Sequence, residues 1–183
     1  MDLVQIKKTV LEMMSDRGYQ TKSKIVDIDN KNLEILESSN ETEICYIFFS
    51  EDTKLRVQEF RKYQQIMEND DIHHCIIVCD QGATSFTSTE LVNVDPSELE
   101  IELIPSEFLI RNPTKHYFYR PHRILSEEEK KLFLQKFDKD KLAMLPKNNR
   151  IPKYFNFPVG SIIEITRCMG SAGPYHYYRI VVE

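Results

Sequence analysis

Two short β-like runs flank a glycine-rich turn in the last forty residues of the chain. The runs are Ser161–Arg167 and Tyr177–Val181, and the turn between them is Gly170-Ser171-Ala172-Gly173-Pro174. Glycine adopts the positive φ angles that tight turns require, so this order favours a β-hairpin. A phosphate-binding loop is the alternative interpretation, but the turn lacks the Lys-Ser/Thr pair and the following helix that such a loop uses.

The first 110 residues alternate between helical and strand-like patterns. Apolar residues recur at helical spacing over Leu3–Met14, and Gly18 is suited to end that helix. A second helix is expected to begin with Asp52 or Thr53 as its N-cap. Strands are expected at residues 43–50, 73–79 and 99–104. The alternation of the two patterns predicts an α/β fold for this half of the chain.

Prolines and a change in the sign of the charge mark a boundary near residue 112. Residues 1–110 hold 10 Lys and Arg against 22 Asp and Glu, a net charge of −12, whereas residues 111–183 hold 14 against 7, a net charge of +7. A residue that precedes proline is pushed out of helical geometry, and Asn112 precedes Pro113. We therefore predict an N-terminal domain of residues 1–110, a linker of residues 111–114 and a C-terminal domain of residues 115–183.

A capping box opens the expected helix of the C-terminal domain. In Ser126-Glu127-Glu128-Glu129 the Ser126 hydroxyl can accept a hydrogen bond from the Glu129 amide, while the Glu129 carboxylate accepts one from the Ser126 amide. We expect this helix to run toward Phe137, with Leu132, Phe133 and Phe137 buried.

Composition excludes several classes of protein. The chain has 183 residues, of which 41% are hydrophobic and 29% charged, so it can build a core. No apolar run reaches the ~20 residues of a membrane span, and no secretory signal is readable at the start, so we expect a soluble, intracellular protein with no membrane partner. Cys45, Cys75 and Cys79 lie in apolar runs, where a thiol usually acts as a small buried hydrophobe.

Motifs at both ends of the chain resemble one protein family. The C-terminal order L-P-K, G-x-I-I-x-I-x-R, S-A-G and Y-Y-R-I-V is similar to the assembly domain of the fifth subunit of eukaryotic RNA polymerases, a domain that archaeal polymerases share. Met13–Tyr19 resembles the M-x-x-D-R-G-Y that ends the first helix of that family. Arg120–Ser126 resembles its V-P-K-H-x-x-L-S. One departure is Ile151-Pro152-Lys153-Tyr154, which stands in a shortened segment where the family usually has Asp-Pro-Val-Ala.

The resemblance implies a fold and a function. It implies an α/β N-terminal jaw domain of nuclease-like topology and a small α+β C-terminal assembly domain with a mixed sheet. The chain would be a non-catalytic subunit that needs no cofactor and forms no homo-oligomer. Its partners would be the largest catalytic subunit, neighbouring small subunits and downstream DNA. It would work in the nucleus of a eukaryote or, for a large DNA virus, in the virion or the host cytoplasm.

The resemblance also marks candidate site residues. In its relatives a Thr-Pro-Ser-Ala loop on the jaw faces downstream DNA, and this chain carries Gln81, Thr84 and Ser85 there, whose polar groups could donate to phosphate oxygens. An ordinary polar turn is the alternative interpretation. Residues expected to serve polymerase assembly are His122, Arg123, Pro146, Lys147, Arg167, Tyr178 and Arg179.

Other chemistries compete with this function. His73-His74-Cys75 with Cys79 is a candidate metal site, but alternate residues of a strand lie ~6.6 Å apart and do not converge, so core cysteines are favoured. A free-standing nuclease would need an aspartate and a strand-borne Glu-x-Lys, which strand 43–50 lacks; Glu59 and Lys62 are interpreted as solvated charges. A soluble adaptor that uses the same C-terminal domain is the third possibility.

The run Lys115–Arg120 interleaves aromatic and basic residues. This pattern is compatible with stacking on nucleic acid. A strand with buried rings, or docking on another subunit, is the favoured interpretation because the resemblance places this run at the entrance of the assembly domain.

Overall fold

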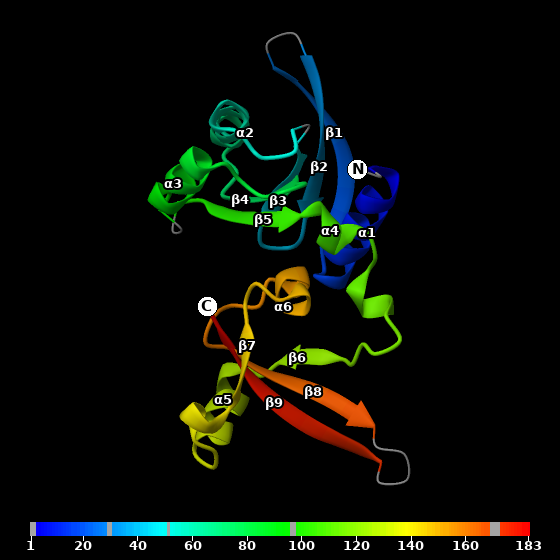
Figure 1. Cartoon of the computed structure of the whole chain (residues 1–183), viewed down its shortest axis with the longest axis vertical. Helices are drawn as coiled ribbons and strands as arrows, with labels where there is room; N and C mark the ends of the chain where they lie inside the picture. The colour runs from blue at the N-terminus through cyan, green and yellow to red at the C-terminus, as the bar shows by residue number, and fades with distance from the viewer. Residues whose placement is uncertain (1–2, 29–30, 51, 96–97, 169–172) are drawn as a thin grey trace. The chain divides into compact units, whose positions relative to one another are not determined.

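A computed structural model of the chain describes residues 3–28, 31–50, 52–95, 98–168 and 173–183 (Figure 1). The chain divides into two compact units, an N-terminal unit of residues 1–112 and a C-terminal unit of residues 113–183. The division falls within the linker expected at residues 111–114. Both units combine helices with a mixed sheet, so the α/β character expected from the sequence is confirmed.

The N-terminal unit is built on a five-stranded sheet in the order β1-β2-β3-β4-β5. The strands are Gln20–Ile28 (β1), Lys31–Ser39 (β2), Ile44–Phe49 (β3), His74–Cys79 (β4) and Glu100–Pro105 (β5). Successive neighbours are antiparallel from β1 to β3 and parallel from β3 to β5. Every side chain of β4 is buried, as in a strand that is covered on both faces. The strands expected at residues 43–50, 73–79 and 99–104 are thus confirmed.

The long β1–β2 hairpin was not expected from the sequence. Its strands are rich in Lys, Ser, Glu and Asn, and Ile25 in β1 is exposed. The hairpin reaches the core through the buried Ile35 and Leu36 of β2, and Val26 and Leu33 pack against the core while partly buried. A strand that is mostly solvated carries too few apolar residues to show a clear two-residue period, because that period arises from burial of one face.

Four helices complete the described part of the N-terminal unit. They are Leu3–Asp16 (α1), Val57–Asp70 (α2), Ser85–Asn93 (α3) and Ser106–Leu109 (α4). α1 buries the expected stripe except for Leu3, which is exposed, and Gly18 follows it with φ +88°. α2 packs Phe60 and Tyr63 into a cluster with Tyr46 and Phe48 of β3. The ring of Phe48 stacks on that of Tyr63 at 4.3 Å between centroids.

The N-cap expected for α2 at Asp52 or Thr53 is wrong. The helix begins after Arg56, whose side chain makes no capping hydrogen bond. Residues 53–55 are instead held against the turn that follows β4 by backbone hydrogen bonds. There the Gln81 amide donates to the Thr53 carbonyl at 2.7 Å, and the Leu55 amide donates to the Gly82 carbonyl at 2.9 Å. Since these backbone groups are already paired, the helix starts only beyond them.

The C-terminal unit has a four-stranded mixed sheet in the order β6-β8-β9-β7. Its strands are His122–Ile124 (β6), Ala143–Pro146 (β7), Ile162–Cys168 (β8) and Pro174–Val182 (β9), and its helices are Glu127–Leu134 (α5) and Arg150–Phe155 (α6), with short 3₁₀ turns at Pro113–Lys115 and Lys139–Lys141. β8 and β9 pair antiparallel over seven residue pairs, so the expected hairpin strands are confirmed, while β7 pairs parallel with β9. The expected turn at Gly170–Ala172 lies outside the described residues.

The capping box of α5 is confirmed, but the expected burial of the helix is not. The Ser126 hydroxyl accepts from the Glu129 amide at 3.2 Å, and the Ser126 amide donates to the Glu129 carboxylate at 2.8 Å. Leu132 and Phe137 are nevertheless 61% and 55% exposed. Phe133 contacts the sheet, with its ring 4.6 Å from that of Tyr178, and Phe137 is stacked on Phe133 at 4.7 Å, so the described part of this unit covers these apolar side chains only partly.

Candidate functional site

The strand register places three of the expected assembly residues on one face of the C-terminal sheet. His122 is paired with Ile165, and Arg179 is paired with Ile163. Cross-strand partners point to the same side of a sheet, so His122 and Arg179 share the face of the core isoleucines. Arg167 stands two residues beyond Ile165 on the same strand and therefore also points to this face.

These residues line a groove of about 300 Å³ on that face of the C-terminal unit. The groove lies among the segment after the first 3₁₀ turn, the strands of the sheet and the start of α6. Its lining contains no aspartate or glutamate and consists of His116, Phe118, Tyr119, Arg120, His122, Leu145, Ile151, Ile165, Arg167 and Arg179. Cationic and imidazole groups thus surround an apolar floor. The sequence did not identify Leu145, Ile151 and Ile165 as groove residues, because apolar side chains in helix and strand patterns are interpreted as core residues.

Two arginines of the groove are stacked on one tyrosine. The guanidinium carbons of Arg167 and Arg179 lie 5.0 Å and 5.3 Å from the ring centroid of Tyr177. Arg179 also donates to the Met144 carbonyl at 3.4 Å, but its buried Nε has no hydrogen-bond partner in the described structure. Burial lowers the pKa of His122, and the nearby charges of Arg179 and Arg167 lower it further. The groove therefore holds positive charge on its arginines and a neutral histidine at pH 7.

The other expected assembly residues of the sheet lie on its opposite face. Arg123 and Tyr178 are both paired in register with Glu164. Arg123 donates to Glu129 at 2.8 Å and to Glu164 at 3.0 Å, so its charge is already matched within the chain. Burial raises the pKa of Tyr178, and the charge of Glu164 raises it further. The charged groups described on this face are paired with one another, so the face is less suited than the groove to bind an anion.

Pro146 and Lys147 stand at the end of β7. Pro146 is paired with Val182, and the Lys147 amide donates to the Val182 carbonyl at 2.7 Å. The Lys147 side chain is exposed. Both residues therefore fasten the parallel edge of the sheet through their backbone, and only the Lys147 ammonium is free to face a partner.

The turn expected to face DNA is the N-terminal cap of α3. Thr84 caps the helix, and its hydroxyl accepts from the Thr87 amide at 3.4 Å. The Thr87 hydroxyl in turn donates to the Leu55 carbonyl at 2.9 Å. Gln81 and Ser85 are exposed. The Thr84 hydroxyl is thus engaged in capping, which leaves the side-chain amide of Gln81 and the hydroxyl of Ser85 as the exposed polar groups of this turn.

The aromatic run before the C-terminal sheet does not form a strand. It follows the 3₁₀ turn at Pro113–Lys115, and Tyr117 and Phe118 are 86% and 73% exposed. The expected strand with buried rings is therefore wrong. Tyr119 is instead stacked on His122, with 5.7 Å between the ring centroids, and it lines the groove together with His116 and Phe118.

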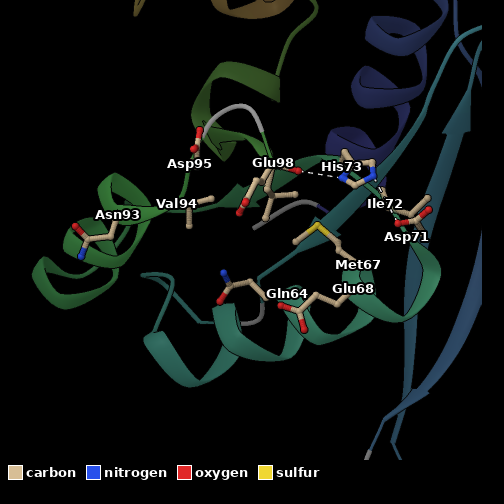
Figure 2. Close-up of a pocket in the computed structure, with 11 residues that line it drawn as sticks. Gln64, Met67, Glu68, Asp71, Ile72, His73, Asn93, Val94, Asp95 and Glu98 are labelled. Atoms are coloured by element: carbon tan, nitrogen blue, oxygen red, sulfur yellow. Dashed lines mark hydrogen bonds and ion pairs between the residues drawn. The ribbon is translucent and has the colours of Figure 1, made fainter.

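A pocket of the N-terminal unit is acidic and thus unsuited to nucleic acid. It has a volume of about 530 Å³ and lies between α2 and the segments around β5 (Figure 2). Glu68 and Asp71 from the end of α2 line it together with Asp95 and Glu98. His73 makes a 3.0 Å hydrogen bond with the Glu98 carbonyl at its rim. Phosphate groups would be repelled from such a lining.

A buried ionic cluster joins α1 to the sheet. The guanidinium of Arg17 donates to both oxygens of Glu102 at 2.8 Å and 2.9 Å, and His74 Nε2 lies 2.8 Å from the same carboxylate. The three side chains are 6–8% exposed. The strand expected at residues 99–104 gave no indication that Glu102 is buried. A pairing with Arg17, which is 85 residues away, leaves no local signal.

The cluster shifts the pKa values of its members. Burial alone would raise the pKa of Glu102, but the hydrogen bond with His74 and the charge of Arg17 outweigh it and lower the pKa. Burial alone would lower the pKa of His74, but contacts with Cys45 and Glu102 outweigh it and raise the pKa to about 10. The cluster is therefore ionised at pH 7.

The groups considered for metal or nuclease chemistry serve packing instead. Cys75 and Cys79 are buried in the core, as expected. Within the described ranges no three acidic, histidine or cysteine side chains are grouped as metal ligands. Glu59, interpreted as a solvated charge, accepts hydrogen bonds from Ser50 at 2.8 Å and from Tyr63 at 2.6 Å, so that interpretation was wrong. No helix in the described part of the chain is long and apolar enough to cross a membrane.

Comparisons with known proteins agree on one family. Residues 111–181 match the family described as RNA polymerase Rpb5, C-terminal domain. The subunit rpabc1 of DNA-directed RNA polymerases I, II and III from Dictyostelium discoideum is 30% identical over 98% of this chain and 97% of its own length. The RPABC1 protein of Caenorhabditis briggsae is 28% identical over 98% of this chain and 95% of its own length. The archaeal subunit Rpo5 of Pyrococcus horikoshii is 47% identical over 39% of this chain and 90% of its own length.

Proposed function

Because the chain belongs to the Rpb5 family, it is a subunit of a multisubunit DNA-directed RNA polymerase, and we propose that it docks on the largest catalytic subunit through its C-terminal unit. The similarity to a polymerase subunit along nearly the whole chain carries this proposal. The groove supports it, because Arg167 and Arg179 present charge that no acidic residue of the groove matches. Such complementary charge gives a docking surface its specificity and its rate of association.

We propose that the N-terminal unit forms part of the lower jaw near downstream DNA. The groups available there are the exposed Gln81 and Ser85 and the outward surface of α3, where Phe86 and Val92 are 81% and 83% exposed. Phosphate contacts that dominate affinity need clustered Lys and Arg, and residues 1–110 have a net charge of −12. The contribution of this unit to DNA binding is therefore positional, through a few polar donors.

The subunit performs no catalysis in this proposal, and nucleotide addition belongs to other subunits. A nuclease and a soluble adaptor are the competing functions. Affinity purification of the tagged full-length chain separates the three. A polymerase subunit is recovered in fixed stoichiometry with very large partners and neighbouring small subunits. Recovery of the chain alone, or with metal-dependent cleavage of DNA that one acidic substitution abolishes, would contradict the proposal. The expected compartment is the nucleus for a cellular polymerase and the virion or host cytoplasm for a viral one.

A further inference from the structure

The groove of the C-terminal unit carries an unmatched pair of guanidinium groups. No carboxylate of the described residues lies within ion-pair distance of Arg167 or Arg179, whereas Arg123 on the opposite face has two acidic partners. Arg179 Nε is buried without an acceptor. Buried charged donors are normally paired, so an absent acceptor points to a ligand that supplies one.

Tyr177 orients both guanidiniums toward the groove. It occupies the position between them on the same sheet face, with the two guanidinium carbons 5.0 Å and 5.3 Å from its ring centroid. A stacked guanidinium loses rotational freedom, so its planar fork is set in advance for an anion that accepts two hydrogen bonds. Arg120 also lines the groove, but its Nη1 already donates to the carbonyls of Tyr117 and Tyr119, which holds it apart from the pair on Tyr177.

We propose that this groove binds a carboxylate side chain of an acidic, partly apolar peptide segment from another polymerase subunit. Glutamate or aspartate would accept hydrogen bonds from Arg179 and Arg167, while an adjacent apolar side chain would lie on the floor formed by Leu145, Ile151 and Ile165. The inference rests on the proposed function, since it names the chemistry by which the C-terminal unit recognises its partner.

The shape and lining favour peptide over nucleic acid. A volume of about 300 Å³ accommodates one or two residues, and the floor is aliphatic. Nucleic-acid sites instead follow the backbone with a continuous row of cations and expose aromatic platforms for successive bases. Here the next arginine of the sheet, Arg123, points to the other face and is neutralised by Glu129 and Glu164. Of the three arginines that line the groove, Arg167 and Arg179 share one tyrosine ring, so their charge is concentrated at one place, which suits one carboxylate.

The test uses the assembled polymerase. Full-length chain with p-benzoylphenylalanine in place of Phe118, an exposed groove residue, is purified with the polymerase, irradiated and digested. Mass spectrometry should identify a cross-linked peptide of another subunit with an aspartate or glutamate within about two residues of the cross-link. Cross-links to DNA or RNA, to peptides without an acidic residue, or to this chain alone would overturn the proposal. Absence of other subunits before irradiation would instead contradict the proposed function.

Substitutions then test the role of the guanidiniums. Arg179→Gln and Arg167→Gln should each lower retention of the chain in the polymerase about tenfold or more at moderate salt, since a bidentate ion pair is lost. Lys136→Gln, which removes one charge from an exposed position outside the groove, should change it less than about twofold. Replacement of the cross-linked acid by arginine should restore retention of Arg179→Glu. Retention of Arg179→Gln equal to that of wild type, with an unchanged circular dichroism melt, would refute the carboxylate site.

Discussion

The buried cluster around Glu102 predicts a large loss of stability when its carboxylate is removed. In Glu102→Gln the side chain keeps its size but loses its charge. Arg17 and His74, at 6% and 7% side-chain exposure, would then lose the buried carboxylate that they share, and Glu43 at 3.7 Å from His74 Nδ1 is a more exposed substitute. Truncating one partner of a buried ion pair costs about 3–5 kcal/mol, because the partner's charge is left desolvated. The Arg17 guanidinium makes two hydrogen bonds with Glu102, and His74 is a second cation that depends on the same carboxylate. We therefore expect a loss of stability near the middle of that range or above it.

The prediction is measurable by equilibrium unfolding. A loss of about 4 kcal/mol should lower the melting temperature of a unit of this size by roughly 15 °C. Because the chain has no tryptophan, far-UV circular dichroism reports the transition, and hydrogen exchange read by mass spectrometry locates it to β4 and β5. Glu100→Gln is the matched control, since Glu100 lies on the same strand but is exposed. Equal transition midpoints for Glu102→Gln and Glu100→Gln would refute the reasoning.

The cluster also predicts how stability depends on pH. The folded-state pKa of His74 is raised to about 10 from its ordinary value of 6.5. The stabilisation from its charged form is therefore complete below about pH 6.5 and is lost as pH rises toward 10. The pKa of Glu102 is lowered, so its contribution is present above about pH 4.5 and is lost as pH falls. In Glu102→Gln the free energy of unfolding should therefore fall less than in the wild type as pH rises toward 10. An alkaline loss unchanged in Glu102→Gln would show that His74 is not the group responsible.

Three further predictions concern other parts of the chain. Ile163→Asp should destabilise the C-terminal unit by about 4 kcal/mol or more, because it buries a charge without a partner in the core of the sheet; a thermal melt like that of wild type would contradict the strand assignment. Thr84→Ala should cost about 1 kcal/mol through loss of the α3 cap, whereas Ser85→Ala should leave the melt unchanged and weaken downstream DNA binding only modestly. Polymerase assembled with residues 113–183 alone should bind DNA somewhat less tightly with a nearly unchanged salt slope, because the acidic N-terminal unit neutralises few phosphates; recovery of the largest subunit by residues 1–112 but not by residues 113–183 would reverse the proposed division.

Features with a local cause were predictable from the sequence. β3 and β4 are continuous apolar runs, the box at Ser126 and Glu129 needs only two residues three apart, and Gly18 ends α1 by its own conformational freedom. Features fixed by distant partners were not predictable. The start of α2 is set by backbone bonds to the turn after β4, and the burial of Glu102 depends on a cation from α1. The prediction that Leu132 is buried was wrong. Its helical spacing predicts a buried face, but the described C-terminal unit does not cover that face.

The two units differ in how far their cationic side chains are paired with acidic side chains of the same unit. In the N-terminal unit many of the scarce cations are already paired within the unit, as in Lys7–Glu34, Arg17–Glu102, Lys24–Asp70, Arg56–Asp52 and Arg61–Glu90. That use of cations leaves little positive charge for phosphates, so a role beside DNA must depend on position. The C-terminal unit has an excess of cations, and its sheet directs two of them into one groove without acidic neighbours. A surface of this kind gains most from a protein partner that brings a carboxylate, since one anion then satisfies donors that the fold itself leaves unpaired.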